Sequence, residues 1–404
     1  MPSLKFEGAG AFAIAILLVV LFAGPASSQT LHDFVEAAAA RNPELAGLAG
    51  RREAIGARQY AADALTPGAP TLNGSYVTDQ VLVNRHQTDA QIGISTPLWL
   101  PGEGTASRRV ADAELIRSSA QAAAIKLKIA GLVRDSLADF ALAQAELAVA
   151  VRRVRDTRAL EVDVGRRSQA REASEADLLL ARAERIAADG ELRERRAALE
   201  QSWLEFRTLT GIAPVAAALN EPLPEAAAAA HPRLADAKGA INVARANRAL
   251  AAIQVRDSPE IGLSARHNQD ISGTVFDNSI GIELRIPFAT DARNRPRQAA
   301  AQAELTEASA SFIAAEREIG TEQQKARIGY DNALAQRGFA HERTRVLIQQ
   351  SALIGRGYQG GQISLFDYVR TRSLAFEAES AVARAEIGVA KARSRLNQAF
   401  GVIP

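Results

Sequence analysis

The chain repeats itself at an offset of about 190 residues, and this internal repeat limits the folds that it can adopt. Short motifs recur in the same order in both halves. Several of them contain glycine, serine, aspartate or proline, which chance matches between alanine-rich stretches explain poorly. The recurring motifs are Asn42-Pro43-Glu44-Leu45 with His231-Pro232-Arg233-Leu234, Ala113-Glu114-Leu115 with Ala303-Glu304-Leu305, and Gly165, Ser174 and Asp177 with Gly355, Ser364 and Asp367. We therefore predict two copies of one structural plan, repeat 1 over 30–213 and repeat 2 over 214–404.

Two long blocks without proline, at 102–213 and 297–403, predict long helices. A proline inside a helix costs about 3 kcal/mol, so its absence over such lengths favours helix. Apolar residues such as Ile125, Ile129 and Leu132 recur at helical spacing. Because a glycine-bearing break lies near the middle of each block, each block is predicted to be a helical hairpin. The hairpins cover about 104–211 and about 296–401, with breaks at 165–174 and 355–364. An arm of about 60 residues is about 90 Å long, too long for a compact enzyme domain.

A shorter helix and a strand-like stretch precede each hairpin. The helices are predicted from Leu31 to about Leu65 and from Leu234 to about Val255. The strand-like stretches are predicted to be β-hairpins at about 70–98 and about 259–288. They alternate apolar and polar residues, as half-buried strands do. In 279–286 the apolar face holds Ile280, Ile282, Leu284 and Ile286, and the polar face holds Ser279, Gly281, Glu283 and Arg285.

These strands allow two interpretations. One is a small sheet packed on helices. The other is a membrane β-barrel, because strands of about 10 residues with a polar inner face suit an outer-membrane barrel. Two hairpins give only four strands, and a membrane sheet must close on itself, so the second interpretation predicts an oligomer. The polar linkers at 79–88 and 268–278 would then be cell-surface loops.

The first 29 residues are typical of a signal peptide. Lys5 lies in the n-region, Ala11 to Ala23 form the apolar core, and small residues follow at 25–28. The alternative is a membrane anchor, but that core is shorter than the roughly 20 residues of a spanning helix. The chain has no cysteine, so it can form no disulfide and cannot be acylated as a lipoprotein. An exported chain of this kind is either periplasmic or a protein of the outer membrane.

Composition and motifs argue against an enzyme and against a nucleic-acid-binding protein. Lys plus Arg number 48 and Asp plus Glu 46, so the net charge of +2 creates no field that would attract nucleic acid. No pair among the five histidines has metal-ligand spacing, and no GxSxG, P-loop or strand–helix GxGxxG motif occurs. Asp177 and Asp367 could be read as a carboxylate pair, but the repeat accounts for both. We predict no catalytic residue, no metal site and no cofactor.

The order of these elements resembles the TolC family of outer-membrane factors over essentially the whole mature chain. The residues that carry the resemblance are Thr30-Leu31, Phe34 and Asn42-Pro43-Glu44-Leu45 in the opening helix, Pro97 and Pro287 where strands turn into helix, and Gly361-Gln362-Ile363-Ser364-Leu365-Phe366-Asp367, which is similar to the family's glycine–x–x–Ser/Thr–x–x–Asp signature. Repeat 1 departs from this signature, because Arg171 stands at the glycine position. The resemblance implies a mainly α-helical fold with a transmembrane β portion, in which three protomers of four strands each build a 12-stranded barrel on an α-helical tunnel.

The resemblance also implies where the channel closes. The hairpin breaks would form a periplasmic tip that closes as an iris and meets an adaptor protein. Asp177 and Tyr358 fall at gate positions of the family, and Ile363 replaces a gate arginine of some members. Other candidate tip residues are Arg166, Arg167, Arg171, Arg356 and Asp367, with Gly165, Ser174, Gly355, Gly361 and Ser364 in the tip motifs. We hypothesise that Asp177 pairs with one of the arginines across neighbouring helices; the alternative is that these are solvated turn charges. Ser174 and Ser364 each precede an acid by three residues, which predicts helix N-caps.

These expectations combine into a passive outer-membrane duct. It would be a homotrimer that works with a periplasmic adaptor and an inner-membrane transporter, such as an RND pump, in efflux or type I secretion. The segment Thr96-Pro97-Leu98-Trp99-Leu100-Pro101-Gly102 resembles members of the CzcC type paired with heavy-metal pumps, so both metal cations and toxic small compounds stay open as cargo. The alternatives are a periplasmic adaptor, which would carry one helical hairpin flanked by β domains, and a structural coiled coil, which would not account for the doubled strands.

Overall fold

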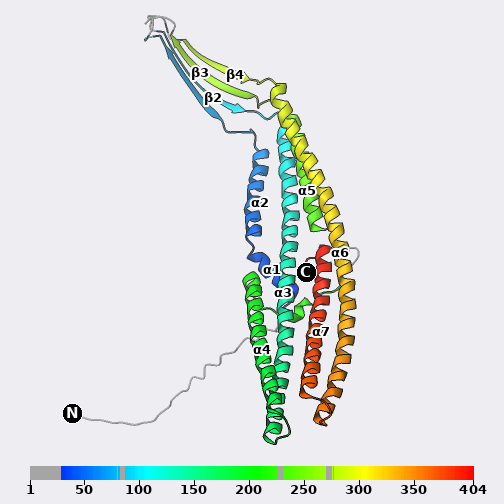
Figure 1. Cartoon of the computed structure of the whole chain (residues 1–404). Coiled ribbons are helices and arrows are strands. Elements are labelled where there is room, and N and C mark those ends of the chain that lie inside the picture. Colours follow the sequence, from blue (N-terminus) through cyan, green and yellow to red (C-terminus); the bar gives the residue numbers. More distant parts are fainter. Residues whose placement is uncertain (1–28, 80, 82–86, 225–230, 270–274, 276) are drawn as a thin grey trace, which may run out of the picture.

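The computed structural model describes residues 29–79, 81, 87–224, 231–269, 275 and 277–404. It shows an elongated protein in which a β-sheet extends from one end of a long helical wall (Figure 1). Apart from Gln29, the predicted signal peptide lies outside the described residues, as does much of the loops predicted at 79–88 and 268–278. Among the described helices, none combines the length and the apolar character needed to cross a membrane.

Both repeats contain helix, β-hairpin and long helical hairpin in the same order. Repeat 1 comprises α1 (Leu31–Ala40), α2 (Pro43–Ala62), β1 (Thr71–Thr78), β2 (Thr88–Pro97), α3 (Glu103–Gln169) and α4 (Glu175–Thr210). After the short 3-10 helix η1 (Ala216–Leu219), repeat 2 comprises α5 (Pro232–Ile253), β3 (Glu260–Gln269), β4 (Asp277–Arg285), α6 (Asp291–Gln359) and α7 (Leu365–Ala399). The predicted mainly α fold with two long helical hairpins and four strands is therefore confirmed.

The helices form one curved wall with two free lateral edges. Across its lower half the order is α4, α3, α7, α6, and across its upper half it is α2, α3, α5, α6 (Figure 1). The two longest helices, α3 with 67 residues and α6 with 69, run along the whole wall. Consequently α6 forms one lateral edge over the full length, while α2 and α4 share the other.

The Asn-Pro and His-Pro pairs begin helices at equivalent places in the two repeats. Asn42 Oδ1 accepts hydrogen bonds from the amides of Glu44 (2.9 Å) and Leu45 (3.2 Å) and so caps α2. His231 Nδ1 accepts from the amide of Arg233 at 3.2 Å and caps α5. Burial lowers the pKa of His231, which keeps the imidazole neutral and able to accept this bond.

The segment predicted as one helix from Leu31 to about Leu65 is two helices, divided at the Asn-Pro pair. α1 ends at Ala40, and α2 begins at Pro43. Steric conflict with the proline ring holds the preceding residue, Asn42, in extended backbone (ψ 122°), and proline has no amide hydrogen to continue the helix.

The long helix of repeat 2 begins five residues before its predicted start near 296. α6 starts at Asp291 and includes Pro296 as its sixth residue. The proline removes one intrahelical hydrogen bond close to the helix end. The first turn is held by the amide of Asn294, which donates to the carbonyl of Thr290 at 3.0 Å, and by an ion pair between Arg293 and Asp257.

The four strands form one antiparallel sheet in the order β1-β2-β3-β4. Its central pair joins the repeats, since β2 of repeat 1 lies beside β3 of repeat 2. The interpretation of a sheet packed on helices is wrong: every residue of β4 is exposed, and the sheet extends beyond the helical wall (Figure 1). β1 and β4 are both edge strands, with no strand on their outer sides among the described residues.

The largest apolar core lies halfway along the wall. Phe34 of α1 and Phe206 of α4 are fully buried and meet edge to face, with 5.0 Å between ring centroids. Val133 and Leu137 of α3 complete the centre of this core. The opening segment of repeat 1 is thereby packed against both arms of its own helical hairpin.

A buried ion pair fastens the segment between the repeats to α3. The side chains of Arg134 and Glu221 are only 3% and 8% exposed, and Arg134 Nε donates to Glu221 Oε1 at 2.9 Å. Arg134 also donates to Gln398 Oε1 (2.7 Å), and Asn397 Nδ2 donates to Glu221 Oε2 (2.7 Å). Because buried charges need partners, this network joins α3, the inter-repeat segment and the end of α7 into one unit.

Replacement of Glu221 by alanine is expected to destabilise the protein by about 3–5 kcal/mol, because it leaves the Arg134 charge buried without its carboxylate. Denaturant unfolding followed by circular dichroism measures this change. Glu379→Ala is the matched control, since it removes a partly exposed ion pair with Arg152 and should cost less than about 1 kcal/mol. Equal losses in the two variants would contradict a special role for the buried pair.

Candidate functional site

The two strand-to-helix connections contain the predicted prolines. Pro97 is the last residue of β2, and Pro287 lies between β4 and α6. After Pro97, the amide of Leu98 donates to the carbonyl of Pro259 at 2.6 Å, which continues the pairing between the repeats. Trp99 Nε1 donates to the carbonyl of Ala64 at 2.9 Å, so this side chain anchors the junction of sheet and wall.

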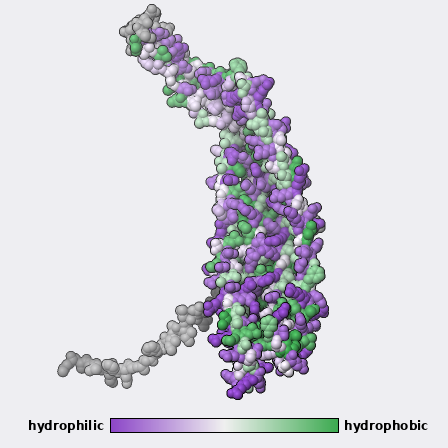
Figure 2. Space-filling model, viewed as in Figure 1, coloured by the Kyte–Doolittle hydropathy of each residue, from purple (hydrophilic) through white to green (hydrophobic). Residues whose placement is uncertain are grey.

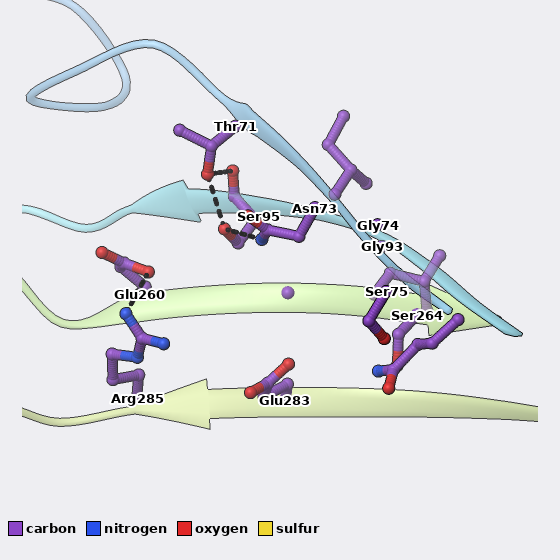
Figure 3. Close-up of a pocket in the computed structure, with 14 residues that line it drawn as sticks. Thr71, Asn73, Gly74, Ser75, Gly93, Ser95, Glu260, Ser264, Glu283 and Arg285 are labelled. Carbon is purple, nitrogen blue, oxygen red and sulfur yellow. Dashed lines mark hydrogen bonds and ion pairs between the residues drawn. The ribbon is translucent and has the colours of Figure 1, made fainter. Parts of the chain in front are cut away.

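One face of the sheet is polar and concave. Its residues line a hollow of about 470 Å³ that includes Thr71, Ser95, Glu260, Glu283 and Arg285 (Figure 3). The hydroxyls of Thr71 and Ser95 are 2.8 Å apart, and Arg285 forms an ion pair with Glu260 at 3.8 Å. Nearer the loops, Asp89 of β2 receives two hydrogen bonds from Arg266 of β3, at 2.8 and 2.6 Å. This face is therefore suited to water and to charged or polar solutes.

The opposite face of the sheet is apolar and exposed. Leu72, Ile94, Leu263 and Ile282 lie side by side across all four strands. Their exposed fractions run from 52% for Ile94 to 79% for Ile282. A contiguous apolar surface of this kind requires a cover, which for a soluble protein is a partner and for a membrane protein is lipid.

At the other end of the wall, both hairpin turns have the same hydrogen-bond pattern. In the first, the amide of Glu172 donates to the carbonyl of Arg167 (2.8 Å), and that of Arg171 to Ser168 (3.0 Å). In the second, Gln362 and Gly361 donate in the same way to Gly357 and Tyr358, at 2.9 and 3.0 Å. Both are Schellman motifs, which require a left-handed residue after the helix.

That left-handed position is filled by different residues in the two turns. Gly361 has φ of 71°, as glycine readily does, whereas Arg171 has φ of 65°. An L-residue with a side chain is strained there by roughly 1–2 kcal/mol. The predicted tip glycines Gly165 and Gly355 do not lie in the turns: they are inside α3 and α6, more than a helical turn before the break.

The predicted N-cap role of Ser174 and Ser364 is confirmed. Ser174 Oγ accepts from the amide of Asp177 at 3.1 Å, and the Asp177 carboxylate in turn accepts from the Ser174 amide. Ser364 Oγ likewise accepts from the amide of Asp367 at 3.1 Å. Both acids also accept from the serine hydroxyls, so each one completes the first turn of its helix.

An arginine–tyrosine stack joins the two hairpins just above the turns. The guanidinium of Arg167 lies 5.1 Å from the ring centroid of Tyr358, and this ring stacks on Tyr368 with centroids 5.3 Å apart. Arg167 also pairs with Asp163 at 3.1 Å. Burial raises the pKa of Tyr358, so its phenol stays neutral at physiological pH. A cation held over an aromatic face is worth about 0.5–1 kcal/mol at exposed sites and more when desolvated.

A second contact between the hairpins lies farther from the tip. Arg372 of α7 pairs with Asp156 of α3, and its guanidinium lies 5.0 Å from the ring centroid of Phe376. Asp156, Tyr368 and Arg372 were not predicted from the sequence. The hairpin geometry could have identified Tyr368, because residues at similar distances before and after a helical turn face each other.

The tip arginines occupy different environments. Arg166 and Arg167 lie in the last turn of α3, Arg356 lies in the last turn of α6, and Arg171 lies in the first turn segment. Within the described part of this single protomer, Asp177 forms no ion pair with any of them.

The structure offers no metal-binding cluster among its described residues, whose histidines, aspartates and glutamates nowhere gather in groups of three or more.

Comparison with known proteins gives a family match for part of the chain and a fold match for most of it. Residues 223–402 match the family described as outer membrane efflux protein. The matched segment covers nearly all of repeat 2, from α5 to α7. None of the curated proteins matches the chain.

The fold is that of outer-membrane channel subunits. The chain superposes on the outer membrane protein VceC of Vibrio cholerae with a TM-score of 0.70 and 16% identity, covering 92% of this chain and 96% of that one. The Campylobacter jejuni CmeC outer membrane channel gives a TM-score of 0.71 with 14% identity and coverage of 92% and 85%. The open state of the Neisseria gonorrhoeae MtrE outer membrane channel gives 0.68 with 18% identity and coverage of 92% and 89%. The efflux family match and these channel folds thus agree.

Replacement of Arg171 by glycine is expected to stabilise the first turn by about 1 kcal/mol, because it removes the strain of a left-handed arginine. Hydrogen exchange of the amides around 168–172 measures the change as slower opening. Gly361→Arg in the second turn is the converse control and should destabilise by a similar amount. Unchanged or faster exchange in Arg171→Gly would show that the arginine side chain stabilises the turn by contacts that outweigh its backbone strain.

Proposed function

We propose that the chain is one of three protomers of an outer-membrane duct that carries solutes from the periplasm to the outside. Its sheet would span the outer membrane, and its helical wall would extend into the periplasm. The observation that carries this proposal is the four-stranded sheet, which has one exposed apolar face, one concave polar face and two free edges.

These three properties suit a segment of a membrane barrel. The row from Leu72 to Ile282 would face lipid, and the hollow lined by Glu260, Glu283 and Arg285 would face water in the lumen. Strands of 8–10 residues are close to the 9–11 that cross a bilayer when tilted. A free strand edge cannot lie in hydrocarbon, where unpaired amides and carbonyls find no water. The edges β1 and β4 would therefore pair with those of neighbouring copies.

The proposal of three copies rests on the family resemblance, and the need for an open passage agrees with it. Two copies would give eight strands, and an eight-stranded barrel is just wide enough for its interior to be filled by side chains. Three copies give twelve strands and leave a passage. The walls of the same three copies would close side by side into a helical tunnel of twelve helices at any level.

The tip is proposed to be the gate. Arg167, Tyr358 and Tyr368 hold the two hairpins of one protomer together, as do Asp156 and Arg372. Release of these contacts would let the hairpins separate and the tunnel open. Asp177 was hypothesised from the sequence to pair with an arginine across neighbouring helices, and we now propose that this arginine belongs to the next copy.

Partners and cargo are proposed from the family resemblance. A periplasmic adaptor would bind near the tip, and an inner-membrane transporter, such as an RND pump, would supply the solute. Export of small toxic compounds or metal cations, the latter as in CzcC-type systems, fits a wide polar lumen. A single adaptor or a structural coiled coil fits less well, because neither requires a free-edged sheet with opposite faces of opposite polarity.

The purified protein is expected to run as a heat-sensitive trimer on denaturing gels and to form channels in planar bilayers. Unheated and heated samples compared on the same gel measure the first property, and single-channel currents measure the second. A protein that leaves membranes without detergent, runs as a monomer and passes no current would rule out the duct.

Asp177→Ala is expected to raise the closed-state conductance by removing the link between protomers. The matched control is Asp367→Ala, which removes the equivalent N-cap acid of the second turn. Capping alone would make the two variants behave alike, whereas a gate contact singles out Asp177. Unchanged closed-state conductance in Asp177→Ala would contradict the gate hypothesis and would not affect the proposal that the protein is a duct.

A further inference from the structure

Each repeat has a helix joint halfway along the wall, where one helix ends and another begins. In repeat 2, α7 ends below the start of α5, and both helices contact α3 and α6 (Figure 1). In repeat 1, α4 ends below α2 in the same way, beside α3. Hydrophilic residues cover much of the wall on the face shown in Figure 2, whereas His231, which lies in the joint of repeat 2, is only 7% exposed. A titratable side chain is thus enclosed at one of the two joints.

His231 connects the start of α5 with the end of α7. Its Nδ1 accepts the hydrogen bond from the amide of Arg233 at 3.2 Å that caps α5. Its ring lies against Gly401, the left-handed residue just after α7, because a methyl group added to Gly401 would come within 2.9 Å of the ring. The carbonyl of the next residue, Val402, accepts a hydrogen bond from buried Arg134 of α3 at 3.1 Å. The imidazole therefore contacts both helix ends and lies next to the buried charge network.

The joint of repeat 1 has the same construction with a cap that does not titrate. Asn42 caps α2 from the place that His231 has in repeat 2. Gly211, with φ of 77°, follows α4, and a methyl group added to it would come within 2.9 Å of Nη1 of Arg41. An asparagine amide gains no proton near neutral pH, and an arginine stays charged. Of the two joints, only that of repeat 2 has a cap whose charge can change near neutral pH.

Protonation of His231 would weaken the joint of repeat 2 in three ways. A neutral imidazole can accept a hydrogen bond at Nδ1, but both nitrogens of an imidazolium are donors, so the bond from the amide of Arg233 would be lost. The new charge would lie at the amino end of α5, where the helix dipole disfavours a cation. A buried charge also needs a partner to replace its hydration. All three effects favour separation of the two helix ends.

The acids that lie near this joint already have partners. Glu318 and Glu322 of α6 both pair with Arg233, at 2.7 and 2.9 Å. Towards α3, the carboxylate of Glu221 is held by Arg134. At the end of α7 the neighbouring charge is a cation, because the guanidinium of Arg327 lies 5.1 Å from the ring centroid of Phe400. Burial is the main cause of the lowered pKa of His231, and Arg233 lowers it further, whereas Glu322 acts in the opposite direction.

We propose that His231 is a pH-sensitive contact that holds the end of the second helical hairpin to α5 at neutral pH and releases it at acidic pH, while the joint of repeat 1 stays closed. In the closed joint the pKa of His231 lies below its ordinary value of about 6.5, and in an opened joint it returns towards that value. The opened joint therefore binds the proton more readily. The closed joint has its full stability above about pH 6.5 and loses stability as the pH falls below that value. This contact belongs to the fold of the protomer and does not depend on the proposed duct.

Hydrogen exchange of the full chain, followed by mass spectrometry at about pH 7.5 and about pH 5.5, measures the opening of both joints on either side of the ordinary histidine pKa. The rates are first corrected for the intrinsic effect of pH on exchange. At the lower pH, the first two turns of α5 and residues 396–402 are expected to open about fivefold more often, the effect of a typical lost N-cap. The start of α2 and residues 206–212, which form the joint of repeat 1, are expected to open equally often at both pH values.

Three variants assign the effect to His231. His231→Asn gives repeat 2 the cap of repeat 1 and is expected to keep the joint closed at both pH values. His231→Ala has no cap and is expected to leave it open at both. The matched control is His32→Gln, because His32 is exposed and its Nδ1 lies 2.7 Å from the carbonyl oxygen of Pro404, close to the same joint. This control is expected to retain the pH dependence of the wild type.

Opening that depends on pH in the wild type and in His32→Gln, but not in His231→Asn, supports the proposal. Three results overturn it: wild-type opening that does not change with pH, equal changes at the two joints, or an unchanged pH dependence in His231→Asn. The comparison of the two joints within the wild type decides the matter even if a variant folds poorly. None of these results bears on the duct, which the heated gel and the bilayer currents test separately.

Discussion

The antiparallel pairing of β2 with β3 determines the arrangement of everything else in this protein. It is the place where the two repeats share a sheet, and it sets their strands in the order of the chain. The helices that leave these strands follow in the same order, so the wall is a single layer and not a closed bundle (Figure 1). A duplicated unit joined in this way leaves two different open edges, β1 of repeat 1 and β4 of repeat 2. The helical wall ends in the same way, at α2 and α4 on one side and at α6 on the other.

The wall is stabilised by many small contributions along its length. Long helices in a single layer bury few large side chains. The contact between the two hairpins includes ion pairs as well as an apolar cluster near the tip that contains Val164, Leu365 and Val369. It includes the pairs Arg152 with Glu379 (2.9 Å) and Arg384 with Glu146 (2.5 Å). Such pairs are worth little one by one. The buried pair of Arg134 with Glu221 differs, because it is shielded from water and ties three segments together. The middle of the wall is thus held by a buried charge network, whereas the tip is held by an apolar cluster and by partly exposed polar contacts.

Most of the architecture could be predicted from the sequence, because it is encoded in periodic features. The proline-free blocks predicted the helical hairpins, and the alternation of apolar and polar residues predicted the strands. The serine and aspartate pairs predicted the N-caps at Ser174 and Ser364. The predicted helix boundaries were wrong at two places, and each of them contains a single proline. Pro43 begins a new helix after the capping Asn42, whereas Pro296 lies within the first two turns of a helix that starts before it.

The tip was predicted in place but not in detail. Both a cap role and a gate pair were predicted for Asp177, and the protomer shows the cap. The contacts between the hairpins, Arg167 with Tyr358 and Arg372 with Asp156, join residues that are far apart in the chain, so local pattern does not reveal them.

The two hairpin turns have the same backbone conformation but different side chains. Arg171, Glu172 and Ala173 occupy the places of Gly361, Gln362 and Ile363, so one turn is charged and the other is neutral. In a ring of three copies the turns would alternate around the rim. A protein that docks there would meet six turns of the same backbone conformation, of which only three carry charged side chains. It could therefore make two kinds of contact with one kind of subunit.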